Sequence, residues 1–200
     1  MKEKIEKIAN VAFERLLKVY ESKTEGGIIF PKYTHGQNKG KLRVSEQEMR
    51  FAFVEEMRKK HPDWYYSVET PTDKKYLFKG KPRIVPEEEE GGQSAQFDLT
   101  IYADSKGDKV LAHIEFKAHN PDVHEMKKDF LKLAEDKTVD MGIERVFIHI
   151  FESFKETTFG NIKNKKLSNC NTDNVQYLCY SLNEHTVTDP PQEDKHKIKF

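Results

Sequence analysis

Hydrophobic residues recur along the chain at two periods, which predict alternating helices and strands. A helical period of three to four residues leaves one apolar face on three segments, 1–22, 45–60 and 122–137. A period of two, or an unbroken apolar run, marks five strands, 64–70, 96–103, 109–118, 145–153 and 175–182. The predicted order is therefore a first helix, then helix, three strands, helix and strand, with a further strand in the tail.

Local signals set the boundaries of these elements. Ser45 is a predicted N-cap, and Glu48 stands three residues later as its capping-box partner. Pro71 is expected to help end the strand at 64–70, and residues 72–94 to form a loop or hairpin insertion. Residues 26–44 are expected to be irregular or hairpin-like. The nearly apolar strand at 145–153 predicts burial on both faces of a mixed sheet.

Size and composition change this picture little. The 200 residues, 36% hydrophobic and with 13 Phe, predict a single domain over 1–200. A net charge of zero provides no global field toward nucleic acid or membrane, so such binding would need local patches. No apolar stretch approaches twenty residues, and the N-terminus is an amphipathic helix, so we expect a cytoplasmic protein without a membrane partner. Cys170 and Cys179 have no zinc-type spacing and are expected to be structural.

The strand at 109–118 carries two charges inside an apolar run. By the two-residue period, Glu115 and Lys117 share one face, together with His113 and His119, opposite an apolar face. Charges in such a strand are expensive to bury unless other charges neutralise them. The strand therefore points to a polar site on one side of the sheet.

The preceding strand supplies a second carboxylate. Phe97, Leu99 and Ile101 are expected on the apolar side, which leaves Asp98 on the other. If the short turn that follows pairs the two strands as a hairpin, Asp98 and Glu115 face the same cleft.

Two carboxylates and an ammonium at one place indicate a divalent metal site. Oxygen ligands from Asp98 and Glu115, with a main-chain carbonyl such as that of Phe116, match Mg²⁺ or Mn²⁺ rather than zinc. A lysine beside such an ion, here Lys117, can orient a water or help to deprotonate it. This combination suits hydrolysis of a phosphodiester.

These residues resemble the PD-(D/E)XK nuclease superfamily, which has the restriction-endonuclease-like fold. Its motif aspartate corresponds to Asp98, here preceded by Phe97 and not by Pro, and its (D/E)XK motif to Glu115-Phe116-Lys117. The family core of helix, three strands, helix and strand matches the order over 45–151. The resemblance implies an α/β fold with a mixed central sheet flanked by helices, extended by an N-terminal helix and a C-terminal segment.

The resemblance also implies an activity, that of a Mg²⁺-dependent endonuclease acting on DNA in restriction or repair. Many members carry a further metal-site glutamate in the first core helix. Glu46 lies nearer the inward face of that helix and is favoured, while Glu48 fits the capping box and is the reserve. Many members dimerise, so a homodimer through the first helix is one expected arrangement. In the second core helix, Lys128 or Lys132 could reach a phosphate, but a solvated face is the favoured interpretation.

Several alternatives stay open. The E/D-x-K tripeptide occurs elsewhere in this charge-rich chain, and a cross-strand salt bridge explains Glu115 and Lys117 without a metal. The chain then would be a non-cleaving nucleic-acid-binding module or a protein-interaction domain. The histidines His113, His119 and His124 are expected to be bystanders or substrate contacts. Basic segments at 32–43 and 74–83, with Tyr33 and Tyr76, suit either phosphate contacts or a solvated surface. The acidic run at 87–90 is expected in a solvated loop.

Overall fold

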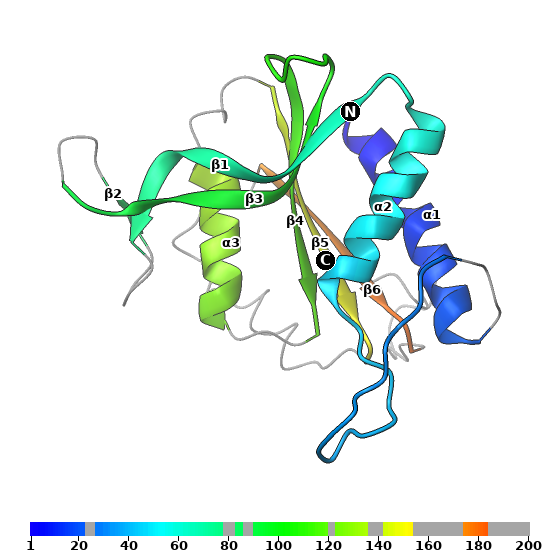
Figure 1. Ribbon diagram of the computed structural model, residues 1–200. Coiled ribbons are helices and arrows are strands. Elements are labelled where there is room, and N and C mark those ends of the chain that lie inside the picture. The colour runs from blue at the N-terminus through cyan, green and yellow to red at the C-terminus, as the bar shows by residue number, and fades with distance from the viewer. Residues whose placement is uncertain are drawn as a thin grey trace, which may run out of the picture.

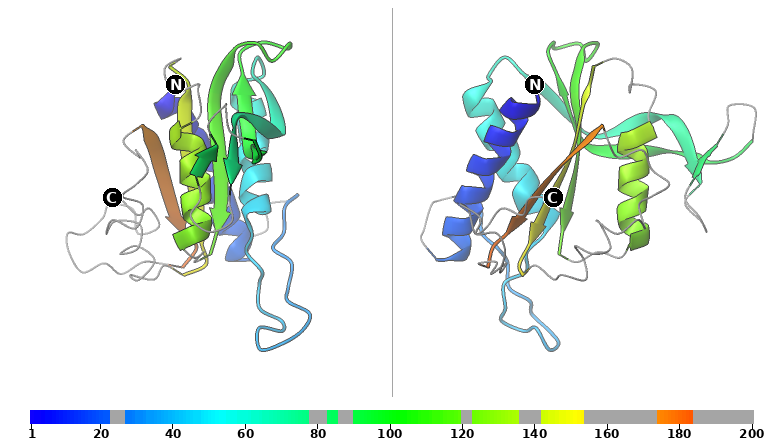
Figure 2. Two further views of the ribbon diagram at one scale, coloured as in Figure 1. Left: turned by 90° about the vertical axis from the view of Figure 1, so that its left-hand side faces the viewer. Right: turned by 180° about the vertical axis from the view of Figure 1, so that it is seen from behind.

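A mixed six-stranded sheet lies between two helices on one face and one helix on the other (Figures 1 and 2). The computed structural model describes residues 1–22, 27–77, 83–85, 90–119, 123–135, 142–153 and 174–183. Its elements are α1 (Lys2–Tyr20), α2 (Glu46–Lys60), β1 (Tyr65–Leu77), β2 (Arg83–Val85), β3 (Gln93–Tyr102), β4 (Val110–Ala118), α3 (Val123–Glu135), β5 (Glu144–Phe151) and β6 (Val175–Ser181). The predicted α/β fold with a mixed, helix-flanked sheet is confirmed.

The strands follow the spatial order β2-β1-β3-β4-β5-β6. The pairs β2–β1, β1–β3 and β3–β4 are antiparallel. The pairs β4–β5 and β5–β6 are parallel. A parallel strand between two others is covered on both faces, and β5 is accordingly buried from Arg145 to Phe151. The expected hairpin between the strands that carry Asp98 and Glu115 is confirmed, with Leu99 opposite Ile114.

Helices α1 and α2 cover one face and enclose the larger core. The apolar stripe of α1 is buried against α2 and the sheet, and Phe13 stacks on Tyr180 of β6 with ring centroids 4.7 Å apart. Phe53 of α2 meets Phe116 of β4 edge to face at 5.8 Å. The predicted capping box is confirmed, because the Ser45 N–H donates to the Glu48 carboxylate at 3.0 Å. Helix α2 therefore begins at Glu46, over the middle of the sheet.

Among the described helices, α3 is the one that packs on the other face (Figure 1). Its apolar side chains form a second core with β3 and β5, in which Phe130 stacks on Phe147 with centroids 4.6 Å apart. The polar side of this helix, including Asp129 and Lys132, turns toward β4 rather than toward solvent. This placement brings charged side chains of α3 against the charged face of β4.

The first strand is longer than predicted, because Pro71 does not end it. β1 continues to Leu77 and pairs with β2, so the expected insertion contains a hairpin. The register shifts between Pro71 and Lys75. Within this irregularity Thr72 Oγ1 accepts a hydrogen bond from the Ala95 N–H at 3.0 Å. A proline is tolerated at a bulge because the regular hydrogen-bond ladder is interrupted there, so no carbonyl of the partner strand depends on the missing N–H.

Other predictions divide between the described and undescribed parts of the chain. Lys32 and Leu42 form an isolated antiparallel bridge, so the segment around them is hairpin-like as expected. Tyr76 is fully buried and does not belong to a basic surface. Cys179 is buried in β6. The predictions for Cys170 and for most of the acidic run at 87–90 concern residues outside the described part of the chain. None of the described helices has the length and apolar character needed to cross a bilayer.

Candidate active site

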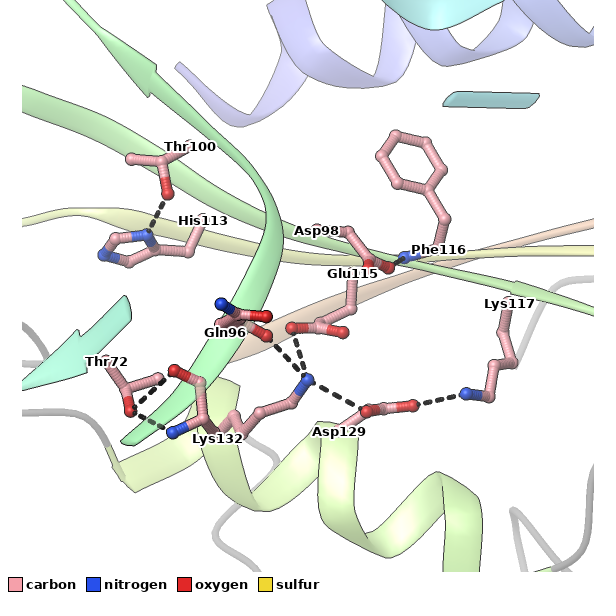
Figure 3. Close-up of polar contacts among 11 residues, drawn as sticks. Thr72, Gln96, Asp98, Thr100, His113, Glu115, Phe116, Lys117, Asp129 and Lys132 are labelled. Carbon is pink, nitrogen blue, oxygen red and sulfur yellow. Dashed lines mark hydrogen bonds and ion pairs between the residues drawn. The ribbon is translucent and has the colours of Figure 1, made fainter. Parts of the chain in front are cut away.

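The candidate site begins where β3 and β4 part. Their ladder is regular at Leu99 and Ile114, and beyond it Asp98 Oδ2 accepts the Phe116 N–H at 2.8 Å (Figure 3). The Asp98 carboxylate thus accepts the main-chain hydrogen bond that a carbonyl of the neighbouring strand would accept in a continuous ladder. This hydrogen bond fixes Asp98 beside the main chain of the Glu115-Phe116-Lys117 motif.

An irregularity in β3 accompanies this parting of the strands. Leu99 packs in the core under α1 and α2, but Phe97 packs with α3 on the opposite face. The prediction that Phe97 shares a face with Leu99 and Ile101 is therefore wrong. The paired residues Val68–Leu99 and Thr70–Phe97 flank Glu69, which has a left-handed backbone with φ +52°. Such a break removes the strict two-residue alternation.

Glu115 and Lys117 share one face of β4, as predicted, and both bind helix α3. Lys132 Nζ lies 2.8 Å from Glu115 Oε1 and 3.0 Å from Asp129 Oδ1, and Asp129 Oδ2 lies 2.8 Å from Lys117 Nζ (Figure 3). Lys132 also donates to the Gln96 carbonyl at 3.0 Å. The four charges form one chain, Glu115–Lys132–Asp129–Lys117, hereafter the ion-pair chain.

The ion-pair chain is buried, which makes its pairing energetically important. Glu115 is 2% exposed, and Asp129 and Lys132 are each 8% exposed. The prediction of a solvated face for Lys132 is therefore wrong. Asp129 and Lys132 are three residues apart and so lie on one side of α3. The packing of Phe130 and Leu133 between sheet and helix presses that side onto β4.

Glu46 reaches the site from the other helical layer. It is the first residue of α2, and its pKa is raised by burial, with Lys117 opposing the rise and Asp98 and Asp129 adding to it. The charges of strands and of α3 therefore act on Glu46. Glu48 is instead held by the capping box. Of the two glutamates weighed from the sequence, Glu46 is the one whose pKa is affected by Lys117 and Asp98, whereas Glu48 is tied to the helix end.

The carboxylates of the site lack sufficient positive charge around them. Burial raises the pKa of Asp98 even though the Phe116 N–H and Lys132 act against the rise. Burial also holds the pKa of Glu115 well above its usual range, against the effect of Lys132. The Arg50 guanidinium at the edge of the site has the smallest effect on Asp98 and on Glu46. An additional cation would stabilise the ionised forms of all three acids.

Lys117 remains an ammonium group in this setting. Burial lowers its pKa, but Asp129 first, then Glu46 and Glu115, raise it above the ordinary lysine value. A lysine with a raised pKa donates hydrogen bonds at neutral pH and does not accept a proton. Lys117 is therefore suited to orient an oxygen atom by donating a hydrogen bond, and not to deprotonate a water.

The histidine near the acidic face has a structural role. His113 Nδ1 lies 3.0 Å from Thr100 Oγ1, and the ring stacks on Phe97 at 4.0 Å. Burial, followed by the charge of Arg145, lowers its pKa to about 4, so it is neutral near pH 7. This agrees with the bystander interpretation. The side chain of His124 lies outside the described residues.

A second histidine, not singled out from the sequence, anchors the turn after β4. His149 Nε2 donates to the His119 carbonyl at 2.7 Å, and its Nδ1 lies 2.6 Å from the Tyr177 hydroxyl. His119 has φ +61°. Burial lowers the pKa of His149 to about 3. Both ring nitrogens are occupied, so His149 holds the end of β4 in place and is not a candidate ligand.

The oxygen donors of the site are those that a hard cation prefers. Their side chains, however, are not placed together in this structure as metal ligands. Asp98, Glu115 and Glu46 are oxygen donors, as Mg²⁺ and Mn²⁺ prefer. However, no three His, Cys, Asp or Glu side chains in the described part of the chain are placed together to hold a metal ion. The reason is that Glu115 is turned to Lys132 and Asp98 to the Phe116 N–H. Metal ligation by these acids, and by the Phe116 carbonyl, stays a prediction.

Comparison of the chain with protein-family models, with curated proteins and with solved structures finds no match. The interpretation of the site therefore depends on its own geometry.

Sequence reasoning found the strand residues of this site but missed Asp129 and dismissed Lys132. One signal was available. A glutamate and a lysine inside a buried strand require partners, and the next element along the chain is a helix with charges three residues apart. The pairing partners could have been sought there.

Replacing Glu46 by Gln should stabilise the metal-free protein near pH 7. Because the folded-state pKa of Glu46 is raised, its ionisation above the ordinary carboxyl pKa favours the unfolded chain. The gain should therefore shrink as the pH falls through about 4 and vanish below about 3, where the group is protonated in both states. Urea unfolding at both pH values with a chelator measures it. Glu14→Gln on the exposed face of α1 is the control, and a destabilised Glu46→Gln at pH 7 would refute the burial argument.

Lys132→Met should destabilise the protein by about 3–5 kcal/mol, because it leaves Glu115 buried without its cation. Adding Glu115→Gln should recover most of the loss, since the remaining amide carries no charge. Chemical denaturation of both variants tests this. Lys109→Met, at an exposed lysine of the β3–β4 turn, is the matched control. Equal stability of Lys132→Met and the control would show that the ion pair contributes nothing.

Proposed function

We propose that the chain is a metal-dependent nuclease of the PD-(D/E)XK type, acting on DNA in the cytoplasm. The observation that carries the proposal is the convergence of Asp98 from β3 with Glu115 and Lys117 from β4, fixed by the hydrogen bond from the Phe116 N–H to Asp98 at 2.8 Å. Glu46 adds a fourth group from α2.

The arrangement of elements supports the same proposal. From α2 onward the described chain runs helix, strands β1, β3 and β4, helix α3 and strand β5, with the short β2 inserted after β1. β1, β3 and β4 form an antiparallel group to which β5 is added in parallel. This order is the one expected for the nuclease core, and it places the acidic residues where the antiparallel strands part.

A divalent cation would complete this site. Asp98, Glu115 and Glu46 would hold it, with the Phe116 carbonyl as the expected main-chain donor. The pKa values of these three acids are raised, so a cation bound beside them would stabilise their ionised forms. When bound, Mg²⁺ or Mn²⁺ acidifies a coordinated water and stabilises charge on a phosphate. The chain's own part is to hold the acids in place and to keep bulk water away from Glu115.

Lys117 would orient the attacking water or a phosphate oxygen. Its ammonium is held by Asp129 Oδ2 at 2.8 Å and is about one-fifth exposed, so it can donate a further hydrogen bond outward. Asp129 is a positioning residue in this account, because it touches Lys117 and Lys132 and not the reacting groups. A fixed donor at the place where charge develops lowers the barrier more than a mobile one.

Lys132 would serve as a built-in cation on the α3 side. Its ammonium lies within 3.0 Å of Glu115 Oε1, of Asp129 Oδ1 and of the Gln96 carbonyl. Three oxygen contacts of this kind are typical of a bound cation, and here the chain itself supplies that cation. The site would therefore take one metal ion on the Asp98 side rather than two.

One observation favours the non-cleaving alternatives. Glu115 and Lys117 already have oppositely charged partners on α3, so their charges do not require a metal for pairing. A nucleic-acid-binding or protein-interaction domain would retain these ion pairs as structure. It would show no dependence on metal and no requirement for Asp98.

Cleavage assays separate the proposals. Labelled single-stranded and duplex DNA should be cut by wild type with Mg²⁺ or Mn²⁺ and not with a chelator. Asp98→Asn and Lys117→Met should each lower the rate by about 10²-fold or more, because each removes a group that acts on the transition state. Asp108→Asn, at an exposed turn carboxylate, is the control and should retain full activity. Cleavage that persists in Asp98→Asn, or a complete lack of products from wild type on these DNAs, would overturn the assignment.

A further inference from the structure

A pocket of about 510 Å³ is lined by residues outside the acidic site. Three elements form it, namely the end of α2, the start of β1 and the turn between β3 and β4, which lie near the top of Figure 1. Its wall combines aromatic rings with cationic side chains. Neither the ion-pair chain nor the proposed metal site uses any of these residues.

The aromatic wall is exposed to an unusual degree. Tyr65 and Tyr66 are 48% and 41% exposed, although large apolar surfaces on a strand normally pack against a neighbour. Trp64 beside them is buried and stacks on His61 at 4.0 Å, which makes the floor rigid. Tyr102 lies in register opposite Tyr65, and its hydroxyl is 2.9 Å from Ser67 Oγ. Trp64 and Tyr102 are held in place by these contacts, and Tyr65 and Tyr66 present exposed rings to a planar ligand.

The rim of the pocket is positively charged. Arg58 and Lys106 line it, both are exposed, and neither side chain has an ion-pair partner among the described residues. Asp104 is the acid on the rim, and its carboxylate accepts the main-chain N–H groups of Lys106 at 2.8 Å and Lys109 at 2.6 Å. Since these donors already engage the acid, the rim favours an anionic ligand.

We propose that this pocket binds an unpaired nucleobase of a single-stranded nucleic acid, with the adjoining phosphates at Arg58 and Lys106. Exposed aromatic rings beside free cations are the features that bind single strands, because every base has a face that stacks and every linkage carries a negative charge. A base inside a duplex is stacked on its neighbours and does not enter such a pocket. The substrate of the candidate active site would then be a strand with an unpaired segment.

The distance to the acidic site suits this role, which as a substrate contact rests on the proposed nuclease function. Tyr66 lies in register opposite Ile101, which stands three residues along β3 from Asp98. Three residues of strand span about 10 Å, and a stacked nucleic-acid strand rises about 3.4 Å per nucleotide. The bound base would lie a few nucleotides from the phosphate that is cut.

The single tryptophan of the chain provides a direct test, because Trp64 lines the pocket. A short mixed-sequence single-stranded DNA, titrated with a chelator present to prevent cleavage, should quench Trp64 fluorescence with saturation. Tyr66→Ala should weaken binding about tenfold, while Tyr66→Phe keeps the ring and should bind like wild type. Arg58→Gln should weaken binding and reduce its dependence on salt. Lys7→Gln on the exposed face of α1 is the matched charge control.

The outcomes separate this inference from the nuclease proposal. Binding that needs Tyr66 and Arg58 supports the inference whether or not the protein cuts DNA, and without cleavage it identifies a non-cleaving binding module. Equal affinity of wild type and Tyr66→Ala, equal binding of a blunt duplex, or failure of the strand to change the fluorescence would overturn it. A peptide that quenches Trp64 where the strand does not would assign the pocket to a protein partner. Circular dichroism of each variant confirms that it is folded.

Discussion

The burial of the Glu115 carboxylate is the constraint on which the rest of the site depends. A carboxylate that is 2% exposed inside a sheet requires a cation within contact distance. Lys132 of α3 supplies it and also pairs with Asp129, and Lys117 pairs with Asp129, so that two acids and two lysines alternate and balance in charge. Helix α3 is therefore fixed to β4 by charge as well as by its apolar face, and Lys117 has a defined position because Glu115 needs a partner.

The second feature that shapes the molecule is the parting of β3 from β4 at Asp98. A regular ladder would keep α2 and α3 on separate faces with no polar group between them. Where the strands part, Asp98 turns to the Phe116 N–H, and the charge of Glu46 on α2 acts across the opening. Further along the sheet, Tyr65 of β1 and Tyr102 of β3 line the aromatic pocket. One irregular sheet thus carries both the acidic site and the surface proposed to hold an unpaired base.

The sequence predicted the elements whose signal is local. The two-residue period placed Glu115 and Lys117 on one face, and the Ser45–Glu48 capping box fixed the start of α2 and left Glu46 for the site. It failed where the signal is not local. Lys132 looked like a solvated side chain because its buried partner lies in another element.

The same limit applies to the strands. Phe97 was assigned to the wrong face because the irregularity opposite Glu69 leaves no mark in the pattern of β3 itself. Pro71 was expected to end β1, since a proline is normally excluded from a ladder, but the bulge that accommodates it depends on Thr72 and on the opposing strand. Each error came from a contact between segments that are distant along the chain.

The central claim, that Asp98, Glu115 and Glu46 form a site for a divalent cation, is tested most directly by thermal unfolding with and without millimolar Mn²⁺. A ligand that binds the folded chain raises the melting temperature by an amount that grows with its concentration. A metal site at these residues should give such a rise in wild type and in the control Asp108→Asn, and the rise should be lost in Glu115→Gln. No rise in wild type, or an equal rise in Glu115→Gln, would contradict the site and would leave the ion-pair chain as structure alone.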